Sequence, residues 1–260
     1  MRSPWNPPRP RPRPRRRPDV VLRLLVRTFS EVCLTAGTVI VLFVAYLLLW
    51  TGVRADRAMD GEVARLHERW AAPAAPTAPA PAAAPAPGAT PSAPATAPPP
   101  APPLADGRAF AEMYVPRFGA DWNKPVLEGT GPEPLKKGLG HYPRSARPGE
   151  SGNFAVAGHR RTYGDPFKDV PELRPGDAVI IKDAVAWYTY TVRTGPLRVL
   201  PTETGVVDPV PQGSPFTAPG RYLTLTTCEP EWGHSHRLVV WAELTGTRPA
   251  GQGPPGGLPR

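Results

Sequence analysis

Cysteine is scarce in this sequence: its 260 residues include only Cys33 and Cys228. Cys33 lies in an apolar segment, where a buried thiol usually packs as a small hydrophobe. A bridge between the two would have to join that segment to a distant domain, so we predict no disulfide. Cys228 is then a lone thiol, and its presence needs a separate explanation.

Acidic residues are almost absent from residues 1–29, where Asp19 stands against nine arginines. This segment alone supplies +8 of the formal net charge of +9, so the remainder is close to neutral. An arginine run could bind nucleic acid, but its place before an apolar segment favours a determinant of membrane topology. We therefore expect no nucleic-acid partner.

Charge is absent from Val32 to Val53, a run of 22 residues. A membrane span needs about 20 apolar residues, whereas the apolar part of a signal peptide has about 7–15 and ends at a small-residue cleavage site. We expect residues 30–53 to form an uncleaved transmembrane anchor. The positive-inside rule puts the Arg/Pro-rich tail, residues 1–29, in the cytoplasm and the rest of the chain outside.

Proline is abundant, at 40 residues, but is concentrated outside the expected domain. Residues 54–107 are predicted to form a juxtamembrane helix, with His67 solvated, and then a Pro/Ala-rich linker, a semi-extended spacer of roughly 3 Å per residue. Residues 248–260 are predicted to be a disordered tail. The remaining residues, 108–247, suffice for one domain with a core.

Short β-branched or aromatic runs, punctuated by proline and glycine, fill the expected domain. Six of them predict strands: Ala111–Pro116, Asn153–His159, Asp177–Asp183, Ala186–Arg193, Arg221–Cys228 and His236–Leu244. Helical signal is limited to single turns near Glu133–Lys137 and Phe167–Val170. We predict an all-β fold, an antiparallel barrel with short helices.

Three residues at strand ends suggest acyl-transfer chemistry. Cys228 closes the run TLTTC, and an idle free thiol is a liability outside the cytoplasm. A cysteine nucleophile needs a proton acceptor. His159, at the end of NFAVAGH, can lie next to Cys228 at one rim of the barrel. Arg237 opens the next strand and could stabilise an oxyanion. Taken singly, each has an ordinary alternative: a core cysteine, a loop histidine and a solvated arginine.

A metal site is a weaker interpretation of the same region. Cys228, His234 and His236 form C-x5-H-x-H. Zinc sites usually have paired ligands at tighter spacing and a fourth partner, and none is evident. We predict neither a metal nor another cofactor.

The segments NFAVAGHR, TLTTCEP and SHRLVV, in this order, resemble the sortase family. In that family the histidine ends an A/G-G-H motif, the cysteine ends a T-L-x-T-C motif and an arginine opens the following strand. Here these are His159, Cys228 and Arg237, separated by 69 and nine residues. The resemblance implies a closed β-barrel of about eight strands and a membrane-anchored cysteine transpeptidase.

Residues 114–130 and 135–153 are similar to the actinobacterial class E branch. This resemblance implies cleavage of a Leu-Ala-x-Thr-Gly signal, rather than Leu-Pro-x-Thr-Gly, between Thr and Gly through a thioester on Cys228. The implied partners are secreted proteins bearing a C-terminal sorting signal and an amine of a peptidoglycan precursor. Tyr114 is the candidate for reading the alanine position, and Thr227 and Glu229 are expected to shape the substrate groove.

Two other functions compete with this interpretation. An L,D-transpeptidase has a Ser-x-Gly-Cys context, whereas Leu-Thr-Thr precedes Cys228. A stalked, non-catalytic module that binds the wall or another protein on a sortase-like barrel stays open. Thiol labelling at mildly alkaline pH separates the transpeptidase from the binding module, because an inert Cys228 supports the binding module.

Overall fold

The computed structural model describes residues 18–72, 103–256 and 258. Most of the expected cytoplasmic tail, most of the Pro/Ala-rich linker and the last two residues lie outside the described residues. The chain divides into two compact units, Met1–Trp50 and Thr51–Arg260.

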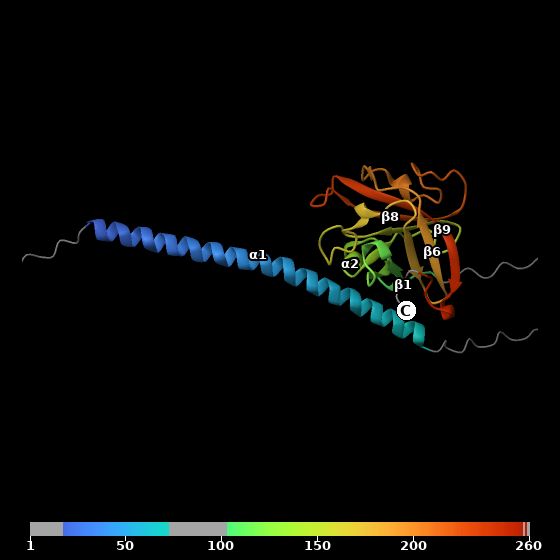
Figure 1. Cartoon of the computed structure of the whole chain (residues 1–260), viewed down its shortest axis with the longest axis horizontal. Coiled ribbons are helices and arrows are strands. Elements are labelled where there is room, and N and C mark those ends of the chain that lie inside the picture. The colour runs from blue at the N-terminus through green and yellow to red at the C-terminus, as the bar shows by residue number, and fades with distance from the viewer. Residues whose placement is uncertain (1–17, 73–102, 257, 259–260) are drawn as a thin grey trace, which may run out of the picture. The chain divides into compact units, whose positions relative to one another are not determined.

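A single helix, α1 (Pro18–Ala71), contains both the expected anchor and the expected juxtamembrane helix (Figure 1). Its segment Val20–Tyr46 is long and apolar enough to cross a membrane, with a mean hydropathy of 1.9. This stretch begins earlier than the expected residues 30–53. Its length and composition are compatible with a single-pass anchor.

The described residues after the linker form one nine-stranded sheet. Its strands are β1 (Ala109–Tyr114), β2 (Asn123–Glu128), β3 (Leu139–His141), β4 (Gly152–Ala157), β5 (Ala178–Lys182), β6 (Ala186–Val192), β7 (Leu197–Val199), β8 (Arg221–Glu229) and β9 (His236–Pro249). The order is β6-β5-β1-β2-β3-β4-β8-β9-β7, and β6 also pairs with β9. That last pairing closes eight strands into a ring and leaves β7 on the outside, so the predicted all-β barrel of about eight strands is confirmed.

The barrel is mixed rather than antiparallel throughout. β4 runs parallel to β8, and β2 runs parallel to β3. The expectation of an antiparallel barrel was therefore wrong. Neighbouring parallel strands end at the same edge of a sheet, whereas neighbouring antiparallel strands end at opposite edges. The parallel pairing is what brings the C-terminal ends of β4 and β8 to one rim.

Short helical turns connect the strands: η1 (Pro116–Phe118), α2 (Pro132–Leu135), η2 (Val170–Glu172), η3 (Thr204–Val207) and η4 (Ala250–Gln252). The turn predicted near Glu133–Lys137 corresponds to α2, and the one predicted near Phe167–Val170 lies just before η2. The expected tail begins inside ordered structure, because Trp187 and Ala186 of β6 pair with Arg248 and Pro249 of β9.

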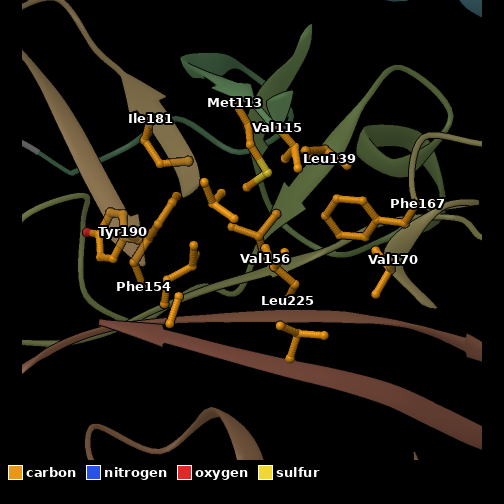
Figure 2. Packing of buried hydrophobic residues seen from close by; sticks show 14 of the residues in the cluster. Met113, Val115, Leu139, Phe154, Val156, Phe167, Val170, Ile181, Tyr190 and Leu225 are labelled. Carbon is orange, nitrogen blue, oxygen red and sulfur yellow. The ribbon is translucent and has the colours of Figure 1, made fainter. Parts of the chain in front are cut away.

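The barrel core is filled by alternate residues of the strands and by residues of the connecting segments, among them Phe167 and Val170. Figure 2 shows Phe167 and Val170, which follow β4 in the chain, pointing into the same cluster as Val156 and Leu225. Burying a side chain of this size contributes about 1.5–3 kcal/mol. The segment after β4 is thus anchored in the core at its far end.

The last turns of α1 belong to the same compact unit as the barrel. His67, expected to be solvated, is only about half exposed, and its Nε2 lies 2.8 Å from Oε2 of Glu112 on β1. Glu112 is fully buried. The histidine is therefore a partner of a buried carboxylate, a relationship that burial of a charged group requires.

Candidate active site

Cys228 and Arg237 are a cross-strand pair. The two residues face each other in the antiparallel register of β8 and β9. Leu223 and Leu225 point into the core, so Cys228, three residues beyond Leu225, points to the outer side of the sheet. Its thiol is free and half-buried, and opposed side chains in such a pair are about 4.5–5.5 Å apart at Cβ.

His159 is brought to the same place by the parallel pairing of β4 with β8. Ala157 pairs with Thr226, and the amide of Gly158 donates to the carbonyl of Thr226 at 3.0 Å. Continuing this register by two residues puts His159 alongside Cys228. The three residues predicted as a catalytic group therefore lie together on one rim of the barrel.

The imidazole of His159 is half-buried against an aromatic ring. Burial lowers its pKa from the ordinary histidine value, and the nearby carboxylate of Asp165 opposes this shift. The ring of Tyr163 lies with its centroid 5.1 Å from that of the imidazole. Such an environment favours the neutral ring, which can accept a proton from a thiol.

The guanidinium of Arg237 is oriented by the loop before β9. Its Nη1 donates to the carbonyl oxygens of His234 and His236, each at 3.1 Å. A guanidinium has five N–H groups in a fixed fork, so these bonds leave other donors for a negatively charged oxygen. His234 and His236 are thus backbone supports for Arg237.

Glu229 is the centre of an ion-pair cluster. Its carboxylate pairs with the guanidinium of Arg160 and, at 2.8 Å, with that of Arg198 on β7. Nη1 of Arg160 also lies 3.5 Å from the carbonyl oxygen of Cys228. These contacts hold Arg160 and Arg198 near the backbone of Cys228. The expected role of Glu229 in the substrate groove stays a prediction.

Thr227 is buried, with 3% of its surface exposed. Its hydroxyl donates to the carbonyl oxygen of Gly158 at 2.8 Å. This bond ties β8 to the end of β4 at the residues that directly precede Cys228 and His159. A direct contact of Thr227 with substrate stays a prediction.

Tyr114 lies elsewhere. Its neighbours Met113 and Val115 point into the core, so Tyr114 points outward, and its ring centroid is 5.5 Å from that of Trp187. Burial and Glu112 raise its pKa well above the usual value. It lines a cavity of about 310 Å³ whose lining does not include Cys228, His159 or Arg237.

Tyr142 is a residue of this region that the sequence reasoning missed. Its hydroxyl lies 3.0 Å from Oγ1 of Thr226, which shares the outer face of β8 with Cys228. Tyr142 also lines a cavity of about 540 Å³ that includes Asn153 and Val207. An aromatic residue just after β3 was the available signal, but only the register of β8 connects it with the thiol.

Two loops flank the rim and are joined by Arg161. Its guanidinium pairs with the carboxylate of Glu231 and lies 5.0 Å from the ring centroid of Trp232. Within the described residues, no group of three or more His, Cys, Asp or Glu side chains is arranged to hold a metal ion. The available chemistry is that of a thiol, an imidazole and a guanidinium.

Comparison with known families agrees with this geometry. The family model described as "Sortase domain" matches residues 113–245, which include all three clustered residues. The chain belongs to the sortase family. Sortase SrtE1 of Streptomyces coelicolor is 32% identical over 240 residues, covering 89% of this chain and 60% of that protein. Sortase SrtE2 of the same organism is 29% identical over 239 residues, covering 89% of this chain and 87% of that protein.

Solved sortase structures match the barrel. Sortase E from Streptomyces avermitilis is 60% identical, with a TM-score of 0.57, and the match covers 60% of this chain and 99% of that one. Sortase E1 from Streptomyces coelicolor, solved with a tripeptide in its active site, is 35% identical with a TM-score of 0.55 and the same coverage. These relatives agree with the class E branch indicated by the sequence.

Proposed function

We propose that this sortase is a membrane-anchored cysteine transpeptidase that cleaves a Leu-Ala-x-Thr-Gly signal between Thr and Gly. The observation that carries the proposal is the register that pairs Cys228 with Arg237 and sets His159 beside them. A thiol, a proton carrier and a permanent cation on one rim supply the three groups that acyl transfer from a peptide needs.

In the first step the thiolate of Cys228 attacks the carbonyl carbon of the Thr–Gly bond. The carbonyl π electrons move to oxygen, and Arg237 stabilises that negative charge by hydrogen bonding. When the oxyanion collapses, the C–N bond breaks and protonated His159 gives its proton to the departing glycine amine. The products are a thioester on Cys228 and a free amine.

In the second step an amine of a cell-wall precursor attacks the thioester carbonyl. The neutral imidazole of His159 accepts the proton that this amine loses, and the C–S bond breaks to regenerate the Cys228 thiolate. Because burial lowers the pKa of His159, it disfavours the imidazolium that must protonate the departing amine. We therefore expect slow turnover.

The rest of the chain fits this role. The apolar segment Val20–Tyr46 of α1 is the anchor, and the arginines before it keep the N-terminus in the cytoplasm. The Pro/Ala-rich linker connects the end of α1 to the barrel. Secreted proteins with a C-terminal sorting signal are the acyl donors, and peptidoglycan precursors are the acceptors.

The testing experiment uses the full chain in lipid nanodiscs. It is incubated with a small amine and a fluorogenic Leu-Ala-x-Thr-Gly peptide, beside a Leu-Pro-x-Thr-Gly peptide. We expect cleavage between Thr and Gly, formation of the amine adduct, and faster reaction of the alanine peptide. A Cys228→Ala variant should give neither product.

As a control, the circular dichroism spectrum of each protein shows whether it is folded. If the folded chain forms no Cys228-dependent product from either peptide, the proposal fails, and an inert thiol would favour a binding module. Equal or faster reaction of the proline peptide would contradict the alanine specificity while leaving the transpeptidase chemistry intact.

A further inference from the structure

The last turns of α1 carry a buried stripe that faces the barrel. Ala55, Met59, Glu62 and Leu66 have exposed fractions of 6%, 1%, 8% and 1%. Their spacing of four, three and four residues is that of one helix face, and the positions between them are mostly exposed. Leu66 packs with Ala109 and Leu127. A helix that served only as a spacer would have no reason to bury one face.

This stripe meets the loop that follows His159. A Cβ atom on Gly164 would lie 2.5 Å from Cε of Met59, 2.8 Å from Oδ1 of Asp56 and 3.5 Å from Cβ of Ala55. Gly164 has a φ of +78° and no side chain, and both properties allow the loop backbone to approach the helix this closely. The loop and α1 are therefore in direct contact.

The loop itself is held in a costly conformation. Thr162, Tyr163 and Asp165 have φ values of 80°, 52° and 48°, on either side of Gly164. Left-handed backbone at such residues costs on the order of 1–3 kcal/mol each and persists only where surrounding contacts enforce it. The core anchors the loop at Phe167, and α1 supports it at Gly164.

A second set of contacts attaches the helix to the barrel. The buried carboxylate of Glu112 lies 2.8 Å from Nε2 of His67 and accepts a hydrogen bond from Nδ2 of Asn123 at 2.5 Å. Arg69 donates to the carbonyl oxygen of Ala109 at 2.6 Å, and Nζ of Lys182 lies 4.8 Å from the ring centroid of Trp70. Release of the helix would remove one partner from a buried carboxylate, which is unfavourable.

From these contacts we infer that the segment Thr51–Ala71 of α1 is a positioning element of the active site. It supports Gly164, and the adjacent Tyr163 ring in turn packs against the imidazole of His159. Met59 is a positioning residue, because it acts on His159 through the loop. The inference rests on the proposed function for its effect on turnover, whereas the contact itself is independent of that function.

Loss of the contact has a defined effect on His159. The strained loop relaxes, Tyr163 moves away and the imidazole becomes more exposed. Burial is the larger influence on this ring, so its pKa rises toward the ordinary histidine value. Ionisable groups near the ring are Asp165 and Tyr163 on its own loop, Cys228 on β8 and Arg237 on β9.

The test compares Met59→Asp with Ala58→Asp in the full chain in nanodiscs. Both add one carboxylate to neighbouring positions of one helix, but Met59 is buried and Ala58 is exposed. We expect Met59→Asp to speed amide exchange of residues 160–168, raise the His159 pKa in an NMR titration and lower kcat/KM at least about tenfold. Ala58→Asp should leave all three unchanged. Met59→Ala should give a smaller effect in the same direction.

Each outcome has a distinct meaning. Unchanged exchange in Met59→Asp would overturn the contact between α1 and the loop. Faster exchange with an unchanged His159 titration would overturn the positioning role and leave a structural one. If the unaltered chain forms no product from either peptide, the proposed function fails, while amide exchange and the titration still decide this inference.

Discussion

Gly158 leaves no space for a side chain directly before His159. A Cβ atom there would lie 2.5 Å and 2.7 Å from ring carbons of Phe167 and 2.8 Å from Cδ2 of Leu139. Gly158→Ala is therefore expected to destabilise the barrel by about 1–3 kcal/mol through overpacking and to lower transpeptidation by displacing His159. Denaturation and peptide cleavage measure the two effects. Gly195→Ala is the matched control, since a Cβ at Gly195 meets no atom within 4 Å, and equal losses in both variants would contradict this account.

The burial of His159 predicts a pH dependence of stability. Because its pKa is lowered in the folded chain, the unfolded chain binds more protons between that pKa and the ordinary value of about 6.5. The stabilisation is fully present above about pH 6.5 and is lost as the pH falls through the folded pKa. The free energy of unfolding, measured by tryptophan fluorescence, should therefore fall more on acidification in the unaltered chain than in His159→Gln. Parallel pH profiles would contradict the prediction.

At this scale the sequence predicts three catalytic residues, whose roles stay a prediction, but it does not predict the residues that support them. Cys228, His159 and Arg237 could be predicted because the order of their short motifs is specific to a family. Tyr163 and Tyr142 could not be predicted, because what places them at the site is their contacts with His159 and Thr226 in the folded chain. Nothing in their immediate sequence distinguishes them from other loop tyrosines.

At the scale of elements, the parallel pair of β4 and β8 determines where the catalytic groups lie. The hydroxyl of Thr227 donates to the carbonyl oxygen of Gly158 between them, at 2.8 Å. Thr227→Val keeps the shape but removes the donor, so we expect a loss of about 1–3 kcal/mol in unfolding free energy and a lower kcat with little change in KM. Thr245→Val, which removes an exposed hydroxyl that donates to Thr189, is the matched control. A larger loss in the control would contradict the prediction.

The strands that the sequence missed have physical reasons for weak signals. β2 contains Pro125, which lowers any strand score, and β3 and β7 have three residues each. The strands predicted from longer apolar or aromatic runs were found within a few residues of their expected ends, although β9 extends five residues beyond the predicted end at Leu244, to Pro249. Direction was the larger error, because residue patterning sets which side chains face the core but carries no information on whether β8 joins β4 in parallel.

At the scale of the whole molecule, the sequence separates anchor, linker and barrel by composition. It does not show that the end of the anchor helix packs on the barrel, because the stripe of Ala55, Met59, Glu62 and Leu66 mixes an acid and an alanine with two apolar residues. Only its partners reveal it as a buried face. A barrel taken from residue 108 onward omits this face, and we expect such a fragment to turn over peptide more slowly than the full chain under matched conditions. Equal rates would argue against that expectation.

The register between β4 and β8 also affects how such a chain can diverge. Strand pairing, rather than the chain between the strands, sets the separation of His159 and Cys228. The segment from β7 to Gly220 packs on the barrel through Val206 of η3, but its exposed parts can gain or lose residues without changing this register, at an entropic cost of only about 0.6 kcal/mol for each doubling of loop length. Lineages that inherit this barrel can therefore change the length of this surface segment while the bond-making chemistry stays the same.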